Sequence, residues 1–381
     1  MILFWYAVFS TIFWVITSLY LFINRKKVRF LADVAGEKLN YEPAVTIIIA
    51  VRNEEADLRQ ALQSVCGLNY HNYQVLAVND RSTDRTPEIL QEFAQHYPQV
   101  SVLNITTLPP GWLGKNNAMY QGYLNSQAEW ILFTDADVVF APNALQKALQ
   151  YVAQNNLDNL TILPEIKSRS ALLVSVMATF QIILELKLKP WSVRNPKSKA
   201  YIGVGAFNLI KRNAYEKAGT HIPIALRPDD DLKLGELVKK AGLHQDVLYG
   251  DKQISLEWYT SLGEFRKGLM KNTFSISNYR WLIALGTALA TLLAFVLPLP
   301  LLLVLGSEPE RGMAFIILVF QIMLYLPRKT MAGKWWNALL MPYAGLLITY
   351  IILKSAWLTL KQGGIYWREH FYPLSELRKN L

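Results

Sequence analysis

Cysteine is nearly absent from this sequence, which has only Cys66 among its 381 residues. An intrachain disulfide framework and a zinc site built from cysteines are therefore excluded. We expect Cys66 to be a buried thiol that packs as a small apolar side chain. The five histidines are scattered and form no pair at metal-ligand spacing, so the chain lacks a ligand set typical of zinc.

Charge is absent from residues 2–23, an apolar run of 22 positions that is long enough to cross a bilayer. A signal peptide would place its basic residues before the apolar run, whereas here a basic cluster from Arg25 to Arg29 follows it. We therefore predict a transmembrane helix over residues 1–24, with the N-terminus outside and the next domain cytoplasmic. The net charge of +10 and the apolar fraction of 52% suit a membrane protein with basic flanks.

Three more apolar runs lie near the C-terminus, at residues 281–306, 313–326 and 335–353. They predict either three spans, or two spans with a re-entrant or interfacial piece, within residues 281–360. Three spans would put the basic, aromatic tail of residues 361–381 outside. Its composition instead indicates a surface-lying segment on the cytoplasmic side, where we expect it.

Another apolar stretch, residues 171–190, is short for a span and is followed by several lysines. It predicts an interfacial helix whose basic flank meets anionic lipid headgroups. The alternative is a buried helix of the soluble domain.

The middle of the chain, residues 40–280, has the pattern of an α/β domain. Short β-branched or apolar runs without alternation suit parallel strands that are covered on both faces. Amphipathic or capped segments between them predict helices, so the domain is expected to be a doubly wound, mainly parallel sheet. The expected strands are residues 45–51, 73–78, 100–105 and 130–133, and one expected helix is residues 116–124.

Polar and acidic residues follow three of these strands. Glu54 comes after the first, Asp80 in the segment NDRSTD after the second, and Asp135 and Asp137 after the fourth. Because ligands bind at the carboxyl ends of parallel strands, these side chains are expected to share one cleft. Paired carboxylates repel unless a cation lies between them, and oxygen ligands together with a substrate diphosphate favour Mg²⁺ or Mn²⁺. The alternative is that Asp135 caps a turn and Asp137 is merely solvated.

Two nucleotide-binding signatures are missing. The chain has no G-x-G-x-x-G motif and no G-x-x-x-x-G-K-[ST] motif, which weighs against NAD and against a P-loop. The NDRSTD segment can act as a turn with helix caps before Pro87. That role leaves Asp80 able to accept hydrogen bonds from a nucleobase or a ribose.

Four motifs in order resemble the family-2 glycosyltransferases of GT-A fold, especially membrane-anchored members that act on lipids, such as ceramide-glucosyltransferase-like and carotenoid- or hopanoid-associated enzymes. The resemblance covers residues 43–275. It implies a Rossmann-like, mainly parallel sheet with helices on both faces, plus transmembrane or interfacial helices at both ends. The motifs are VTIIIAVRNEE, VLAVNDRSTD, PPGWLGKNNAMYQG and WILFTDADVVF.

The resemblance also implies roles for individual residues. Asp80 would contact the nucleotide base, and Lys115 would lie near the nucleotide or its phosphates, with Glu54 also on the nucleotide-sugar side. Asp135 and Asp137 would form the D-x-D pair, with Asp137 the direct metal ligand. A lysine beside glycines can also approach a diphosphate closely for purely physical reasons, although it could be an ordinary exposed lysine.

A candidate catalytic base lies in the segment of residues 226–242. Three aspartates, Asp229 to Asp231, begin an expected helix, where carboxylates are favoured by the helix dipole and one or two of them would be ordinary caps. The family has an acidic residue and an aspartate here, followed after two residues by a leucine. Matching that pattern onto Leu234 makes Asp231 the base, with Asp230 as the alternative.

The acceptor side is less distinct. Gly203 and Gly205 in YIGVGAF would let an acceptor approach the backbone, or would let a strand pack tightly on a helix. Lys271 lies where a diphosphate contact could come from. The Q-x-x-R-W motif of processive polysaccharide synthases is missing.

These features together predict a membrane glycosyltransferase. It would transfer one sugar, with inversion, from a nucleotide-diphosphate sugar to a hydroxyl of a lipid at the cytoplasmic face. The alternatives are a processive polysaccharide synthase and a non-catalytic membrane scaffold that retains the fold. The chain has no RNA-binding motif, and the basic surplus suits an anionic membrane better than nucleic acid, so no nucleic-acid partner is expected.

Overall fold

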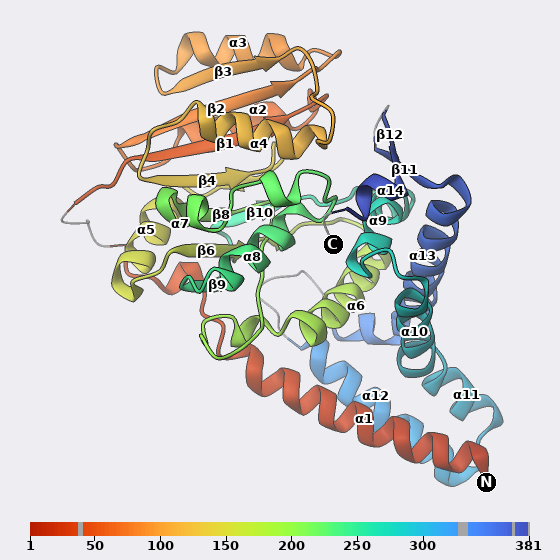
Figure 1. Cartoon of the computed structure of the whole chain (residues 1–381). Coiled ribbons are helices and arrows are strands. Elements are labelled where there is room, and N and C mark those ends of the chain that lie inside the picture. The colour runs from red at the N-terminus through yellow and green to blue at the C-terminus, as the bar shows by residue number, and fades with distance from the viewer. Residues whose placement is uncertain (37–40, 327–333, 368–369, 380–381) are drawn as a thin grey trace.

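The computed structural model describes residues 1–36, 41–326, 334–367 and 370–379; the side chain of Lys271 and the expected first domain residue, Asn40, lie outside this described part. A twisted sheet with helices on both faces occupies the middle of the chain. Long helices from the two ends of the chain gather beside it (Figure 1).

The main sheet has seven strands in the order β3-β2-β1-β4-β8-β6-β9. Its pairs are parallel except those that β8 forms with β4 and with β6. This mainly parallel sheet confirms the predicted α/β class. Its strands are β1 (Val45–Val51), β2 (Tyr73–Asp80), β3 (Val100–Ile105), β4 (Trp130–Thr134), β6 (Asn159–Leu163), β8 (Asn208–Lys211) and β9 (Gln245–Tyr249).

The predicted strands are found, with small changes at their ends. Strands β1 and β3 have the predicted bounds, and β2 runs two residues further, to Asp80. The stretch 201–207, for which a strand was one interpretation, is instead irregular, and β8 begins at Asn208. Two glycines within this stretch bring it against helix α8 without a strand ladder, so the strand interpretation was wrong.

Helices cover both faces of the sheet, and β1 shows why. Ile47 and Ile49 of β1 belong to the core on one face, whereas Ile48 belongs to the core on the other. A strand buried on both faces needs no polar alternation, and each such side chain contributes about 1.5–3 kcal/mol when fully buried. One core includes α2 (Leu58–Cys66), α3 (Thr86–His96) and α5 (Ala144–Asn155); the other includes α4 (Gly114–Leu124), α7 (Arg212–Lys217) and α8 (Asp230–Lys240).

The single cysteine lies at the end of α2. Cys66 is partly buried and free, and burial raises the pKa of its thiol to about 11. A thiol with so high a pKa is a poor nucleophile at neutral pH. Cys66 therefore packs beside the apolar core, less deeply than the sequence analysis expected.

Several short elements connect the main sheet to the rest of the chain. A second sheet has three strands in the order β5-β10-β7. It carries the residues that follow β10 toward the carboxyl ends of the main strands. These elements are β5 (Val139–Phe140), β7 (Glu165–Ile166), β10 (Ile254–Leu256), and the 3₁₀ turns η1 (Leu31–Asp33), η2 (Pro190–Ser192) and η3 (Ile222–Ile224).

The helices beside the sheet form a third apolar core of their own. Within the part of the chain that the structure describes, three helices are long and apolar enough to cross a membrane, and a pair of helices bent by 49° would be a fourth span if the pair crosses as one. The three are Ile2–Arg25, Ala171–Ser192 and Trp335–Gln362. The second was expected to be short for a span; its 22 residues are long enough, and about half of the helix is buried within the protein. The helices are α1 (Ile2–Arg25), α6 (Ala171–Leu188), α9 (Leu262–Ile276), α10 (Trp281–Thr291), the π-helix η4 (Leu292–Val296), α11 (Pro298–Leu305), α12 (Glu308–Tyr325), η5 (Trp335–Leu340) and α13 (Met341–Gln362).

An ion pair joins the inner ends of three of these helices. Arg25 at the end of α1 donates from Nε to the Glu185 carboxylate of α6 at 2.8 Å, and from Nη1 to the Leu324 carbonyl of α12 at 3.3 Å. Helices α1 and α12 lie side by side (Figure 1). The N-terminal helix is therefore fixed to the sheet domain through α6.

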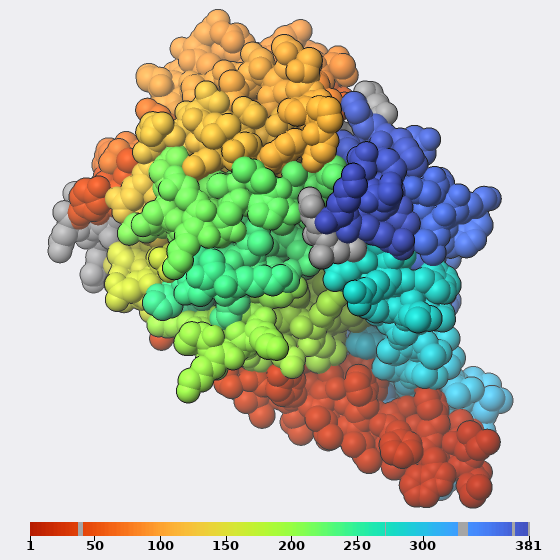
Figure 2. All heavy atoms as spheres, viewed as in Figure 1, coloured from red at the N-terminus to blue at the C-terminus, as the bar shows by residue number. Residues whose placement is uncertain are grey.

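The tail returns to the sheet domain. After α13 the chain forms the strands β11 (Gly364–Trp367) and β12 (His370–Pro373), then the short helix α14 (Leu374–Leu377). Figure 2 shows these C-terminal residues, in dark blue, seated against residues of the sheet domain. The tail thus packs with the folded body of the chain, and its position at the cytoplasmic membrane surface stays a prediction.

Candidate active site

A cavity of about 390 Å³ opens at the carboxyl ends of β1, β2 and β4. This is the edge at which parallel sheets bind ligands, since each strand delivers its next residues there. The cavity gathers five side chains that the sequence analysis singled out. They are Glu54, Asp80, Lys115, Asp135 and Asp137.

Asp135 and Asp137, which follow β4, line this cavity. The charge of Lys115 is affected both by Asp135 and by the two aspartates that begin α8. Lys115 Nζ is 2.6 Å from Asp135 Oδ1. Burial opposes the charge of Lys115, but Asp135, together with the α8 aspartates, outweighs burial and raises the pKa of Lys115. Burial, and after it the Asp135 carboxylate, raises the pKa of Asp137. The lysine thus forms an ion pair with Asp135, whereas at Asp137 burial and the neighbouring carboxylates Asp135 and Glu54 outweigh the opposing effect of Lys115.

A second group of charges surrounds Asp80 at the end of β2. Arg81 donates to the buried Asp80 carboxylate from Nε at 2.7 Å and from Nη2 at 3.0 Å. Arg52 Nη1 lies 3.7 Å from Asp80 Oδ2. A side chain at Gly114 would clash with Asp80 Oδ2, so the start of α4 can meet this cluster only with glycine. Two arginines that the sequence analysis left without a role therefore hold Asp80 in place.

The three aspartates at the start of α8 have different environments. Asp229 is paired with Arg227 through two hydrogen bonds of 3.0 and 2.9 Å, so it is a structural residue. Asp231 is only partly buried, and it accepts hydrogen bonds from the backbone N–H groups of Gly205 at 2.8 Å and Leu232 at 2.7 Å. Burial raises the pKa of Asp231, while Lys115 and these two donors act in the opposite direction. These contacts fix the Asp231 carboxylate and leave part of it accessible.

Asp230 is more deeply buried than Asp231. Its carboxylate accepts no hydrogen bond from any residue that the structure describes, and burial raises its pKa. Neither Asp230 nor Asp231 lines the cavity of about 390 Å³. They are linked to it through Lys115, whose pKa both of them raise, and through Gly205, which donates to Asp231.

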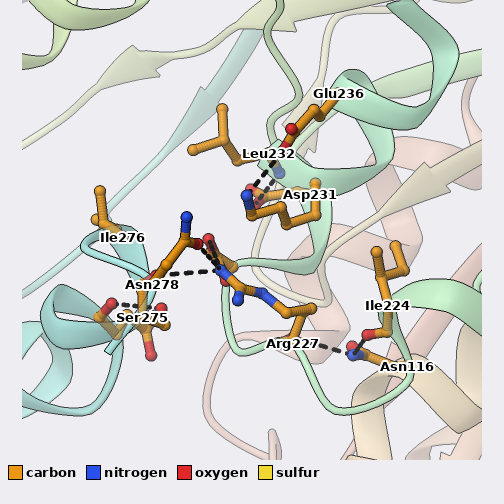
Figure 3. Close-up of polar contacts among 12 residues, drawn as sticks. Asn116, Ile224, Arg227, Asp231, Leu232, Glu236, Ser275, Ile276 and Asn278 are labelled. Carbon is orange, nitrogen blue, oxygen red and sulfur yellow. Dashed lines mark hydrogen bonds and ion pairs between the residues drawn. The ribbon is translucent and has the colours of Figure 1, made fainter. Parts of the chain in front are cut away.

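A hydrogen-bond network fixes the segment before α8, as Figure 3 shows. Asn116, next to Lys115, donates from its buried Nδ2 to the carbonyls of Ile224 at 2.8 Å, Ala225 at 3.1 Å and Arg227 at 3.0 Å. Arg227 Nη2 donates in turn to the Ser275 carbonyl of α9 at 3.1 Å. The lysine of α4 and the aspartates of α8 are therefore held in one rigid arrangement.

Two glycines proposed to contact an acceptor have close structural neighbours. A side chain at Gly203 would clash with the backbone carbonyl of Asp231, so Gly203 lets the irregular stretch 201–207 pack on α8. A side chain at Gly205 would clash with Asp135 Oδ2 and lie 3.0 Å from Lys115 Nζ. Gly205 thus makes room for the ion pair, and the acceptor role of either glycine stays a prediction.

Lys271 lies within α9, and its side chain is outside the described part of the structure. A diphosphate contact by Lys271 therefore stays a prediction. Glu54 does line the cavity, and its backbone N–H donates to Thr86 Oγ1 at 2.9 Å.

Five aromatic residues of the cavity wall were missed by the sequence analysis. Three of them come from the C-terminal strands β11 and β12, and two follow β10. Only the aromatic character of the tail hinted at them, and it was interpreted as a membrane-surface pattern. They are Trp258, Tyr259, Trp367, His370 and Tyr372.

The residues present fit a divalent cation that shares its coordination with a diphosphate. Among the described residues there is no group of three or more His, Cys, Asp or Glu side chains that could hold a metal ion alone. Mg²⁺ and Mn²⁺ commonly take only one or two carboxylates and receive further oxygens from substrate phosphates and water. Asp137, whose pKa is raised by burial and by the Asp135 carboxylate, offers such a ligand beside Asp135.

Residues 46–219 match the family model described as "Glycosyl transferase family 2". The chain contains a family-2 glycosyltransferase domain. This segment carries the D-x-D pair and Lys115, whereas the α8 aspartates and the helices α9 to α13 lie beyond its end.

The most similar curated relatives include both polymer-forming and lipid-acting enzymes. A poly-beta-1,6-N-acetyl-D-glucosamine synthase of Staphylococcus epidermidis is 28% identical over 222 residues, covering 57% of this chain and 51% of the relative. A beta-monoglucosyldiacylglycerol synthase of Nostoc sp. is 38% identical over 105 residues, covering 27% of this chain and 22% of the relative. The chain therefore spans about half, or less, of the length of these relatives.

A solved structure shares the fold along nearly the whole chain. The mannosyltransferase PcManGT from Pyrobaculum calidifontis, in complex with GDP-Man and Mn²⁺, superposes with a TM-score of 0.58 at 16% identity. The match covers 94% of this chain and 98% of that one. It confirms the predicted GT-A fold of the family-2 domain.

Replacing Gly205 with alanine tests the geometry of the ion pair. The added methyl group would displace the Asp135 carboxylate from Lys115, so we expect the Gly205→Ala variant to fold and to lose roughly 100-fold in sugar-transfer rate. Transfer rate and thermal unfolding in detergent are the measurements. Gly263→Ala is the control, because a side chain there meets nothing closer than 3.7 Å. Equal activity of the two variants would contradict the proposed geometry.

Proposed function

We propose that the protein is a membrane-bound glycosyltransferase that moves one sugar from a nucleoside diphosphate sugar to a hydroxyl of a lipid. The observation that carries this proposal is the single cavity at the sheet edge. It combines a D-x-D pair, a lysine and a buried carboxylate at a neighbouring strand end.

The parts of a donor match the parts of this cavity. Asp80 would accept hydrogen bonds from the nucleoside, since two arginines hold its carboxylate at the cavity wall. Lys115 and the ion at Asp135 and Asp137 would face the diphosphate. The complex of PcManGT with GDP-Man and Mn²⁺ supports a donor of this class bound with a divalent metal.

Asp137 and Asp135 would hold Mg²⁺ or Mn²⁺, which supplies positive charge to the departing diphosphate. The protein contributes the geometry around that ion. Lys115 already carries a positive charge 2.6 Å from Asp135 and can shift toward a phosphate as a point charge.

Asp231 would act as the general base. The acceptor hydroxyl oxygen would bond to the anomeric carbon while the bond from that carbon to the diphosphate oxygen breaks. Its electron pair leaves with the nucleoside diphosphate, and the hydroxyl proton moves to Asp231. One such step inverts the anomeric centre, through a transition state of oxocarbenium character. The two backbone donors that fix Asp231 would aim it at this proton.

A lipid acceptor is supported by the aromatic surface between the cavity and the membrane helices. Trp258 and Tyr259 line the cavity. Trp258 also packs on Phe180 of α6, with ring centres 6.1 Å apart, and both cavity rings pack on Phe265 of α9. These contacts give the cavity an apolar wall on the side of α6 and α9, which would suit the apolar part of a lipid acceptor. The glucosyldiacylglycerol synthase relative of Nostoc sp. supports an acceptor of this kind.

The position of the tail bears on the membrane arrangement. Trp367, His370 and Tyr372 line the same cavity as Asp80, so the tail and the sheet domain lie on one side of any membrane. An even number of crossings must then separate them, which favours two C-terminal spans with a re-entrant or surface-lying piece over three spans. The basic cluster after α1 supports a cytoplasmic position for this side.

A processive polysaccharide synthase is the second candidate, because a poly-beta-1,6-N-acetyl-D-glucosamine synthase matches more than half of this chain. The missing Q-x-x-R-W motif argues against it. A non-catalytic scaffold is less well supported, because the cavity retains Asp80, Asp135 and Asp137, and Asp231 is retained at the start of α8.

Replacing Asp137 with asparagine tests the metal role. The neutral amide is nearly isosteric but a poorer ligand for a hard cation, so we expect sugar transfer to fall roughly 100-fold or more at saturating donor. Release of nucleoside diphosphate from UDP-glucose, UDP-N-acetylglucosamine and GDP-mannose would be measured with Mn²⁺ and with a chelator. Asp57→Asn is the control, since Asp57 is exposed and its side chain makes no cap hydrogen bond. Full activity of Asp137→Asn would remove the metal role.

The Asp231→Asn and Asp230→Asn variants identify the base. We expect Asp231→Asn to bind donor normally and to lose roughly 100- to 10,000-fold in transfer, the usual contribution of a general base. Asp230→Asn should lose less of the transfer rate, because the Asp230 carboxylate is more deeply buried than that of Asp231 and is less accessible to the acceptor hydroxyl. Donor affinity and single-turnover transfer are the measurements. The reverse order of the two losses would assign the base to Asp230.

Comparison of lipids from cells with and without the gene tests the acceptor class. We expect one glycosylated lipid to disappear from the mass spectrum of the deletion strain and to return with the intact gene but not with the Asp137→Asn form. A polymer of many sugars that disappears instead would favour the synthase alternative.

A further inference from the structure

The C-terminal hairpin has two unlike faces. Side chains alternate along β11 and β12, so residues that are paired across the hairpin share a face. Tyr366 is paired with Phe371, and both are exposed, with ring centres 5.0 Å apart. The other face consists of two pairs, Ile365 with Tyr372 and Trp367 with His370.

Three of the four side chains on this second face line the donor cavity. They are Trp367, His370 and Tyr372, and the fourth, Ile365, is buried in the helix core. We name this face the inner face. Because side chains alternate along the strands, the aromatic residues of the tail are divided between the two faces, and only the inner face borders the cavity.

The inner face lies at the nucleoside end of the cavity. The Tyr372 hydroxyl donates to the Trp112 carbonyl, just before α4, at 3.2 Å. Burial raises the pKa of Tyr372, and the charges that also act on it are Arg81, Asp80 and Arg52. By contrast, the charge that acts on Tyr259 is Asp137, at the opposite end. Tyr372 therefore borders the Asp80 cluster, which also meets the start of α4 at Gly114.

The hairpin is firmly held in this position. Gly363 ends α13 with a positive φ of 70°, which turns the chain directly into β11, and its carbonyl accepts from Leu374 N–H at 2.7 Å. Arg378 donates to the Tyr279 carbonyl at 2.9 Å, and Leu377 is buried. These contacts make the inner face a fixed wall.

We propose that the inner face of the C-terminal hairpin forms one wall of the nucleoside subsite, with Trp367 and His370 contacting the base of the donor. This inference rests on the proposed function, because it takes the cavity to be a donor site. Nucleobases present flat faces on which indole and imidazole rings stack. Tyr372 is a positioning residue, which ties this wall to the loop before Lys115.

Binding of UDP and GDP in the presence of Mn²⁺ tests the proposal on the full-length protein in detergent. We expect Trp367→Ala and His370→Ala each to weaken binding of at least one of these nucleotides by about fivefold or more, the lower end of base–aromatic stacking. Trp367→Phe keeps a ring and should restore most of the affinity. Tyr366→Ala and Phe371→Ala change the outer face of the same two strands and should bind as the wild type does.

Binding of inorganic pyrophosphate with Mn²⁺ distinguishes contacts to the base of the donor from contacts to its diphosphate. It has no base, so its affinity should be the same in the wild type, Trp367→Ala and His370→Ala. In transfer assays these variants should raise KM for the donor more than they lower kcat. The proposal is overturned if both inner-face variants bind UDP and GDP as tightly as the wild type, or if they lose pyrophosphate affinity equally.

The same measurements distinguish failure of this inference from failure of the proposed function. A wild-type protein that binds a nucleoside diphosphate, with inner-face variants that bind it equally well, would leave the glycosyltransferase proposal standing and remove the hairpin from the donor site. A wild-type protein that binds neither UDP nor GDP would overturn both.

Discussion

The crowding of carboxylates around one lysine is the constraint on which the rest of the site depends. Lys115 balances Asp135 directly, and the α8 aspartates Asp230 and Asp231 also raise its pKa. Burial makes each of these charges costly, so none could be placed here without the others. Asp137 is balanced less completely, because burial and the Asp135 carboxylate raise its pKa more than Lys115 lowers it. A site of this kind is prepared for one additional cation, which is how a donor bound with a divalent ion would complete it.

Much of the sheet could be predicted from the sequence, because its strands are specified locally. The run at 45–51 is β-branched and apolar throughout, and only a strand covered on both faces buries all of it. The acidic residues after β4 follow from the same logic, since a buried strand can end in two aspartates only where it reaches a polar edge. Residues 201–207 were harder, because their glycines have contacts with α8 that spacing along the chain does not reveal.

The cavity wall contributed by the tail could not be predicted, because its partners are distant in the chain. Tyr372 bonds to Trp112 across 260 positions, and no local pattern specifies that pairing. Alternating aromatic and polar residues near an apolar helix suit an interfacial segment as well as they suit a cavity wall, so the pattern alone predicts the interfacial segment. The same reason applies to Trp258, which follows a three-residue strand and shows no periodicity. Sequence patterns thus identified the charged half of the cavity but not the aromatic half.

The aromatic half connects the cavity physically to the membrane helices. Helix α13 continues through Gly363 into the hairpin without a linker, and Ser355 of α13 donates to the Met270 carbonyl of α9 at 2.6 Å. Helix α9 in turn holds Arg227 through its Ser275 carbonyl, in the segment that leads to the α8 aspartates. One helix pair therefore supports both the hairpin wall and the segment that positions the proposed base. In a lipid-modifying enzyme, this arrangement would assemble the donor wall and the base only where the helices are packed together, which is beside the membrane that supplies the acceptor.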